Sequence, residues 1–347
     1  MQVEVHDSVV EATVRPRLIR LAPNLVAVCF TLMKLLPAWF MLRAARQTGR
    51  LVPGERVVET SSGTFGLALA ILCRLQGLNL TLVTDPVVDG WFKRRLEALG
   101  ARVDLVNAEA GSSAVQALRM AKLRERLDEC PRSFWPNQYG NPDNPKAYDL
   151  VAELLADTVG PLDVLVGPVG SGGSLCGTTS RLRERTPDLA AVAVDTPGSV
   201  LFGLECGQRL LRGLGNSLLP PNLDHSVVDE VHWVGAAEAF LATRELHRLH
   251  ALYMGPTSGA AWLVARWLAQ REPRRTVAVI MPDEGFRYST TIYDPEWCRG
   301  HGAGLEALPA TPASIRHPAD CGATWSRMSW GRRRLVEVVQ AARVEVA

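Results

Sequence analysis

Lysine is scarce in this sequence, and so is net charge of either sign. Only four lysines occur among the 38 basic residues, and the formal net charge of the 347 residues is +2. A nearly neutral chain lacks the excess of positive charge by which many proteins bind nucleic acids or anionic membranes. We therefore expect neither nucleic acid nor membrane as a partner.

Cysteine motifs and long apolar runs are missing too. The seven cysteines form no CxxC pair and no Cys/His cluster with zinc-ligand spacing, so we expect no metal site and the reduced thiols of a cytoplasmic protein. Thr31–Leu42, one of the longest apolar stretches, contains a charge and a proline and is too short to span a membrane. The N-terminal residues are too acidic and too weakly apolar for a signal peptide. Without repeats or low-complexity blocks, this length and a hydrophobic content of 47% predict a globular chain of two domains.

Strand-like and helix-like segments alternate along most of the chain. Strands are expected at residues 18–22, 25–30, 56–59, 78–85, 102–106, 164–166, 190–195, 227–234 and 275–281. Helices are expected at residues 34–48, 67–77, 90–100, 113–127, 147–157, 236–249 and 255–270. This alternation predicts two α/β domains, each a mostly parallel twisted sheet flanked by helices. From His301 the pattern weakens and resembles a tail, with one last amphipathic helix expected at Arg332–Val346.

One of the four lysines, Lys34, interrupts an apolar run from Cys29 to Leu42. A lysine in such company is expected to be partly desolvated, which lowers its pKa and leaves more of the neutral amine that attacks carbonyl groups. The alternative is a lysine at a helix start whose stem packs while its ammonium group reaches water.

A glycine-rich segment, Val166–Ser174, follows an apolar strand and precedes a helical pattern. Its glycines would let backbone N–H groups converge on an anion, and the start of the helix adds partial positive charge. We predict a phosphate site at Gly170, Ser171, Gly172, Gly173 and Ser174; the alternative is a tight turn with structural glycines. No lysine follows, so this is not a Walker A loop.

Three further loops have related chemistry. Ser61, Ser62, Gly63 and Thr64 follow a strand and precede a helix, an arrangement that suits a carboxylate or a phosphate but also describes an ordinary helix cap. Gly255–Ala261 repeats this pattern, and Met281–Thr291 places the carboxylates of Asp283 and Glu284 directly after a strand. Four such loops together with Lys34 favour a cofactor site.

In this combination the chain resembles the tryptophan-synthase-β type (fold type II) of pyridoxal-phosphate enzymes. Its cysteine synthase branch is the most similar, and within it the enzymes that make a 2,3-diaminopropionate precursor from O-phosphoserine and glutamate. The resemblance covers roughly residues 15–298 in unbroken order. It is carried by Lys34 and by the segments SSGTFG, NQYGNPDNPKAY, GSGGS, LRGLGNSLLPPNLD, GPTSGAA and PDEGFRYSTTIYD.

The resemblance implies a role for each motif. Lys34 stands where the family has its Schiff-base lysine, Ser61–Thr64 and Gln138 where it binds the substrate carboxylate, and Gly170–Ser174 where it holds the cofactor phosphate. It also implies pyridoxal 5'-phosphate, small amino-acid substrates and a homodimer. The expected domains are residues 1–35 plus 146–300 for the cofactor, 36–145 as a small mobile domain, and 301–347 as an extension.

Three positions depart from the family pattern. Leu35 replaces the acidic residue that usually follows the lysine, and Thr64 replaces an asparagine beside the cofactor's 3-hydroxyl group. Glu284, or Asp283 with a shift of one residue, stands where the family places a hydroxyl near the pyridine nitrogen. A carboxylate there would keep the pyridine protonated and make it a stronger electron sink; alternatively Glu284 turns to solvent.

The expected reaction is β-replacement on an O-activated L-serine, O-phosphoserine or O-acetylserine, through an aminoacrylate. The nucleophile is an amine such as glutamate, or sulfide, in specialised amino-acid biosynthesis. One alternative is β-elimination (dehydration) or racemisation of serine or threonine, which the carboxylate near the ring would favour. The alternative of another class is a cofactor-binding subunit without turnover.

Overall fold

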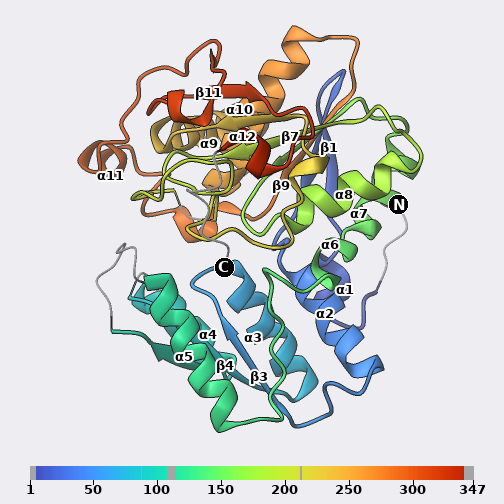
Figure 1. The fold of residues 1–347 in the computed structure, drawn as a ribbon, viewed down its shortest axis with the longest axis vertical. Helices are drawn as coiled ribbons and strands as arrows, with labels where there is room; N and C mark the ends of the chain where they lie inside the picture. Colours follow the sequence, from blue (N-terminus) through green and yellow to red (C-terminus); the bar gives the residue numbers. More distant parts are fainter. Residues whose placement is uncertain (1–4, 87, 108–114, 212, 340–347) are drawn as a thin grey trace. The chain divides into compact units, whose positions relative to one another are not determined.

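The computed structural model describes residues 5–86, 88–107, 115–211 and 213–339, and the chain divides into two compact units (Figure 1). Unit 1 contains the chain up to Val14 and Leu32–Ala147. Unit 2 contains Arg15–Thr31 and the chain from Tyr148 onward. Each unit has its own sheet.

Unit 1 is built on three parallel strands in the order β3–β4–β5. They span Arg56–Thr60 (β3), Asn79–Thr84 (β4) and Arg102–Leu105 (β5). Because the strands are parallel and joined through helices, the loops that follow β3 and β4 lie at the same edge of the sheet. These are the loops that begin at Ser61 and Asp85.

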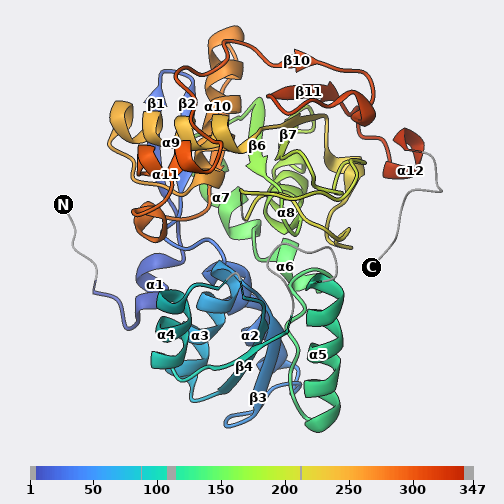
Figure 2. The same ribbon diagram turned by 90° about the vertical axis from the view of Figure 1, so that its left-hand side faces the viewer.

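Helices cover both faces of this sheet. Thr64–Gln76 (α3) and Gly90–Ala98 (α4) lie on one face and Val115–Glu129 (α5) on the other, as Figure 2 shows. Leu35–Gln47 (α2) packs against α3, and Asp143–Lys146 (α6) packs against α2. Val9–Thr13 forms α1. The predicted β-α-β-α-β series is confirmed; the first two residues of the helix expected at 113–127 lie outside the described residues.

Unit 2 contains an eight-stranded sheet in the order β1–β2–β9–β6–β7–β8–β11–β10. Its central strands β2, β9, β6, β7 and β8 are parallel, while β1 pairs antiparallel with β2 and β11 with β8. The bounds are Arg17–Ala22 (β1), Leu25–Cys29 (β2), Val164–Pro168 (β6), Ala190–Asp195 (β7), Glu230–Trp233 (β8), Val277–Met281 (β9), Ala313–Ser314 (β10) and Ser326–Ser329 (β11).

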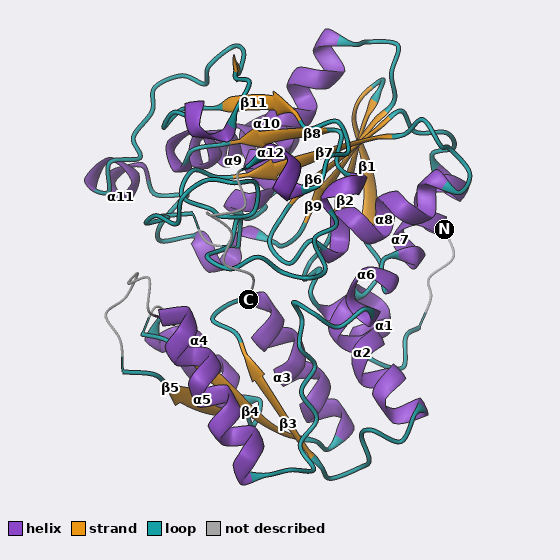
Figure 3. Ribbon diagram, viewed as in Figure 1, coloured by secondary structure: helices purple, strands orange, loops and turns teal. Residues whose placement is uncertain are grey.

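Two helix pairs flank the central strands (Figure 3). Asp149–Thr158 (α7) packs on Gly173–Arg183 (α8), which contacts β6 and β7. Ala236–His250 (α9) packs on Pro256–Arg271 (α10), which contacts β9, β6 and β2. Alternate strand residues such as Val164, Val166 and Val279 form the apolar core with α9 and α10. Burial on both faces explains why these strands read as continuous apolar runs.

The C-terminal segment corrects the sequence-based expectation of a tail. After Pro295–Gly300 (α11), the chain adds β10 and β11 to the large sheet, and the side chain of Trp325 is fully buried. The Trp325 indole N–H donates to Nδ1 of His232 at 3.0 Å. The last described helix, α12, spans only Leu335–Val338. The prediction of a helix that begins at Arg332 and continues through Val339 is therefore wrong. Residues 340–346 of that predicted helix lie outside the described part of the chain.

The predicted fold class is confirmed, because each unit has a largely parallel sheet between helices. Among the described residues, no helix has both the length and the apolar character needed to cross a membrane.

Candidate active site

Lys34 is the residue immediately before α2, between the buried side chains of Met33 and Leu35. Burial lowers the pKa of its ammonium group to about 8. At pH 7 about a tenth of these groups are therefore neutral amine, far more than for an ordinary lysine, as the apolar run in the sequence predicts. An amine in this state can act as a nucleophile or accept a proton.

The Ser61–Thr64 loop joins the end of β3 to the start of α3. Ser61 is buried, and its Oγ accepts hydrogen bonds from the backbone N–H groups of Gly63 at 3.3 Å and Gly66 at 3.1 Å. Because these two bonds use the oxygen as an acceptor, the hydroxyl hydrogen is directed elsewhere. Gly63, the residue before α3, offers no side chain to cap the helix, so the Ser61 hydroxyl is the side-chain acceptor described for its first turn. Hydroxyl and N–H donors at a helix N-terminus suit a carboxylate.

Gln138 is tied to the same strand through a buried carboxylate that the sequence did not single out. Glu59 accepts hydrogen bonds from the backbone N–H groups of Thr60 at 2.7 Å and Gln138 at 3.3 Å, and from the indole of Trp135 at 3.1 Å. Asn144 donates to the Gln138 carbonyl at 2.5 Å. Burial raises the pKa of Glu59 to about 7, against these hydrogen bonds. Glu59 thus ties the Gln138 backbone to the end of β3, directly before the Ser61–Thr64 loop.

The glycine-rich loop of unit 2 runs from the end of β6 to the start of α8. Gly172 has a φ of +83°, which a residue with a side chain seldom adopts. A Cβ at this position would lie 2.5 Å from the Cα of Leu223 and 2.7 Å from the carbonyl oxygen of Asn222. Only glycine therefore fits this turn.

Ser171 and Ser174 are both almost completely buried beside this turn. Helix α8 begins at Gly173 without a side-chain cap, and the first N–H groups of a helix have no partner within it. A hydrogen bond from the side-chain amide of Asn216 to the Gly170 carbonyl, at 3.3 Å, also stabilises the loop. This loop has the conformation and the donors that a phosphate group requires.

Asp283 and Glu284, which follow β9, have different surroundings. Asp283 is buried and accepts a hydrogen bond from the Tyr288 hydroxyl at 3.0 Å, while its carbonyl accepts from the Gly255 N–H at 2.9 Å. Burial raises the pKa of Asp283 to about 6. The Gly255 loop expected from the sequence is therefore attached to the Asp283 loop.

Glu284 is a quarter exposed and belongs to a small polar cluster. Its Oε1 accepts hydrogen bonds from the guanidinium of Arg17 at 2.9 Å and from the hydroxyl of Thr31 at 3.3 Å. An exposed ion pair of this kind contributes little to stability, roughly 0–1 kcal/mol.

Asp195, another carboxylate, ends β7 and is completely buried. Burial raises its pKa to about 7, partly opposed by the Ser199 hydroxyl and the Thr196 N–H. Between pH 4 and 7 the folded chain therefore keeps a proton that the unfolded chain has lost, so this residue lowers the free energy of unfolding as the pH rises, by at most about 1.4 kcal/mol per pH unit.

Asp195→Asn should remove this pH dependence. We expect the variant to become more stable relative to the original chain as the pH rises from 4 to 7, in urea unfolding at several pH values. The exposed Asp188→Asn serves as control. Parallel pH profiles for Asp195→Asn and the original chain would contradict the assignment.

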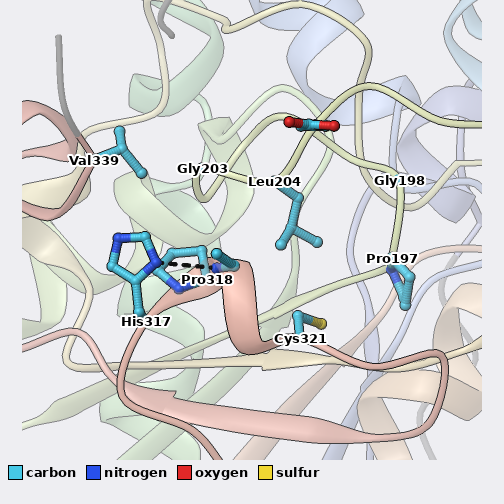
Figure 4. Close-up of a pocket in the computed structure, with 10 residues that line it drawn as sticks. Pro197, Gly198, Gly203, Leu204, His317, Pro318, Cys321 and Val339 are labelled. Carbon is cyan, nitrogen blue, oxygen red and sulfur yellow. Dashed lines mark hydrogen bonds between the residues drawn. The ribbon is translucent and has the colours of Figure 1, made fainter. Parts of the chain in front are cut away.

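Unit 2 also contains a cavity of about 610 Å³ (Figure 4). It is lined by the loop after β7 and by the C-terminal segment, including Gly198, Leu204, His317, Pro318 and Val339. None of the site residues expected from the sequence lines it.

The predicted site residues thus form two sets, one in each unit. Unit 1 carries Lys34, Ser61, Ser62, Gly63, Thr64 and Gln138, and unit 2 carries Gly170, Ser171, Gly172, Gly173, Ser174, Asp283 and Glu284. Within unit 1, Glu59 links Gln138 to the end of β3, from which the serine loop follows.

Comparison with known proteins agrees with this chemistry. The family model described as pyridoxal-phosphate dependent enzyme matches residues 33–283. Two curated proteins named N-(2-amino-2-carboxyethyl)-L-glutamate synthase are similar. The one from Ralstonia nicotianae is 34% identical over 286 residues, which cover 79% of this chain and 84% of the relative. The one from Cupriavidus metallidurans is 33% identical over 290 residues, covering 80% and 85%.

Solved structures of the same kind share the fold. The O-acetylserine dependent cystathionine beta-synthase of Helicobacter pylori aligns with a TM-score of 0.77 at 27% identity, covering 84% of this chain and all of that one. An O-acetylserine sulfhydrylase of Entamoeba histolytica aligns with a TM-score of 0.77 at 25% identity, covering 84% and 92%. The resemblance expected from the sequence motifs is confirmed.

Proposed function

The chain belongs to the family of pyridoxal-phosphate-dependent enzymes, and we propose that it catalyses β-replacement on an O-activated L-serine with an amine as the nucleophile. The observation that carries the proposal is the buried amine of Lys34, in a chain that also contains the glycine-only turn at Gly172. The first suits covalent attachment of an aldehyde, and the second suits its phosphate.

Each part of the cofactor has candidate residues in this chain. Lys34 would bind it covalently, and Gly170–Ser174 would hold its phosphate through backbone N–H groups and the hydroxyls of Ser171 and Ser174. Thr64 would face its 3-hydroxyl group. When bound, pyridoxal phosphate supplies an electron sink that stabilises negative charge at the substrate Cα.

The remaining steps use side chains of this chain. Ser61, Ser62, the N–H groups of Gly63 and Thr64, and Gln138 would hold the substrate carboxylate. The amine of Lys34, once released, would accept the Cα proton, which its lowered pKa favours near neutral pH. Departure of the β-oxygen substituent and addition of the nucleophile to Cβ complete the replacement.

Asp283 and Glu284 are the candidates for the pyridine nitrogen. Asp283 is the more buried, while Glu284 already accepts hydrogen bonds from Arg17 and Thr31. A carboxylate at this position would favour a protonated pyridine and a stronger electron sink than a hydroxyl group would.

The curated relatives support an amine nucleophile, and glutamate in particular, because both are named as synthases of an aminocarboxyethyl derivative of glutamate. O-Phosphoserine and O-acetylserine are the activated serines we propose; sulfide is the second nucleophile, since one structural relative is named a sulfhydrylase. We further propose a homodimer in the cytoplasm, a setting that the seven unpaired cysteines support. Light scattering of the purified protein should give twice the chain mass.

An assay of pyruvate distinguishes replacement from β-elimination. With O-phosphoserine alone we expect little pyruvate, and with glutamate we expect consumption of O-phosphoserine at a much higher rate without pyruvate. Pyruvate release at the same rate with and without glutamate would identify an eliminating enzyme instead. Binding of the cofactor with no turnover of either activated serine would favour a non-catalytic subunit.

A further inference from the structure

Helix α5 carries an arginine on its buried face. Arg119 lies four residues after Val115 and four before Leu123, and these two side chains are buried. Positions four apart share one face of a helix, so Arg119 belongs to the stripe that packs on the sheet of unit 1. Its own side chain is only 7% exposed. A charge at such a position requires specific partners.

The partners of Arg119 are at the carboxyl ends of β3 and β4. Its Nη1 donates to Oδ2 of Asp85 at 3.1 Å, and its Nε donates to the hydroxyl oxygen of Thr60 at 2.8 Å. The same Nη1 also lies 3.4 Å from the hydroxyl oxygen of Ser62. Asp85 neutralises the guanidinium, and Thr60 and Ser62 flank the first residue of the serine loop.

A guanidinium only donates hydrogen bonds, so each hydroxyl group that it contacts must accept with its oxygen and direct its hydrogen elsewhere. When the oxygen of Ser62 accepts from Arg119, its hydrogen points away from Arg119 and can be donated to another acceptor. The hydroxyl oxygen of the neighbouring Ser61 likewise accepts hydrogen bonds, from the N–H groups of Gly63 and Gly66, so its hydrogen is directed away from them. Two consecutive serines are thus arranged as donors, and an ionised carboxylate only accepts.

From this geometry we propose that Arg119, held by Asp85, is a positioning residue that orients the Ser62 hydroxyl and the Thr60–Ser62 backbone for binding of the substrate carboxylate. The inference rests on the proposed function, because it takes the serine loop as the carboxylate site. In this role Arg119 acts through Ser62 and Thr60. Lysine cannot replace it, since one ammonium group lacks the planar fork that reaches three acceptors.

The test compares Arg119→Lys with Arg126→Lys in the purified, cofactor-loaded protein. Arg126 lies on the same helix and pairs with Asp104 and Glu129, so it controls for loss of an ion pair in α5. The readout is the Kd of L-alanine, an amino acid without a leaving group, measured by calorimetry, together with KM and kcat for O-phosphoserine. We expect Arg119→Lys to raise the Kd and KM about tenfold, the loss of one charge-assisted hydrogen bond. The kcat should stay within about twofold, and Arg126→Lys should leave all three values unchanged.

A double-mutant cycle separates positioning from a general structural effect. In a Ser62→Ala background, Arg119→Lys should weaken L-alanine binding by clearly less than tenfold, because the hydroxyl that Arg119 orients is gone. If Arg119→Lys does not fold, Thr60→Val provides the same test, since it keeps the side-chain shape and removes the acceptor of Nε. We expect it to raise the Kd of L-alanine several-fold.

Each outcome decides the proposal separately from the proposed function. Unchanged L-alanine binding in Arg119→Lys, or an undiminished effect in the Ser62→Ala background, would overturn the positioning role. If L-alanine binds and responds to these variants while no activated serine is turned over, the positioning role stands and the β-replacement proposal fails. If the original chain binds no amino acid, the serine loop is not a carboxylate site and the inference is wrong.

Discussion

Replacing Lys34 by alanine should abolish turnover, lowering kcat at least about 1,000-fold, because both covalent attachment of the cofactor and the acceptor of the Cα proton are removed. Lys34, directly before α2, is suited to both roles because burial keeps its pKa near 8.

Borohydride reduction followed by intact mass measurement tests the covalent role independently of activity. The original chain should gain the mass of one reduced cofactor, and Lys34→Ala should gain none. Lys93→Ala is the matched control, because Lys93 pairs with Glu97 on the surface of α4. Below pH 8 the ammonium form of Lys34 predominates, so the rate of covalent attachment should fall as the pH falls through that value. Cofactor on Lys34→Ala at another lysine would contradict the assignment.

Replacing Gly172 by alanine should cost the chain most of its affinity for the cofactor, with Kd at least about tenfold higher. The added methyl group would overlap the backbone of Asn222 and Leu223, which lie 2.5–2.7 Å from the position of the Cβ. Because the obstacle is backbone, the loop itself must move, and the N–H groups at the start of α8 then no longer converge on the phosphate.

Gly160 provides a control for backbone strain. Its φ of +85° is close to the +83° of Gly172, but a Cβ there would meet nothing within 4 Å. Both variants should lose about 1 kcal/mol of stability from the left-handed conformation, while only Gly172→Ala should lose cofactor affinity. Fluorescence titration with pyridoxal phosphate measures the difference. Equal affinities for the two variants would show that the loop does not hold the phosphate.

Much of the fold could be predicted because local signals and tertiary structure agree. The buried parallel strands appear as short apolar runs bounded by glycine or proline, and observed β9 and α10 begin and end within two residues of the predicted bounds. The tight turn in the glycine-rich loop could also be predicted, because Gly172 adopts a positive φ that glycine adopts readily and other residues seldom adopt.

The C-terminal segment could not be predicted in this way. Its strand β11 reads Ser-Arg-Met-Ser, without an apolar run, and it forms because it pairs with the distant β8. The signal that was available is the spacing of Trp325, Met328 and Trp330, three large side chains that are buried in the structure. Tryptophans in a polar segment indicate a core contact more reliably than its weak periodicity does.

The buried charged residues that hold the serine loop and Gln138 in place could not be predicted from the sequence either. Glu59 and Arg119 each resemble ordinary charged residues, one in a strand and one in a helix. Their importance follows from tertiary contacts between α5, the ends of β3 and β4, and the Gln138 loop. For Arg119, the clue was a charge in the apolar stripe between Val115 and Leu123.

Mass spectrometry of the reaction products tests the central claim most directly. Purified protein, saturated with pyridoxal phosphate, is incubated with O-phosphoserine and L-glutamate, and the products are identified by mass with Lys34→Ala as the blank. The proposed β-replacement predicts inorganic phosphate and one new amino acid with the mass of N-(2-amino-2-carboxyethyl)-L-glutamate. Phosphate with pyruvate and ammonia, or unchanged O-phosphoserine, would contradict it.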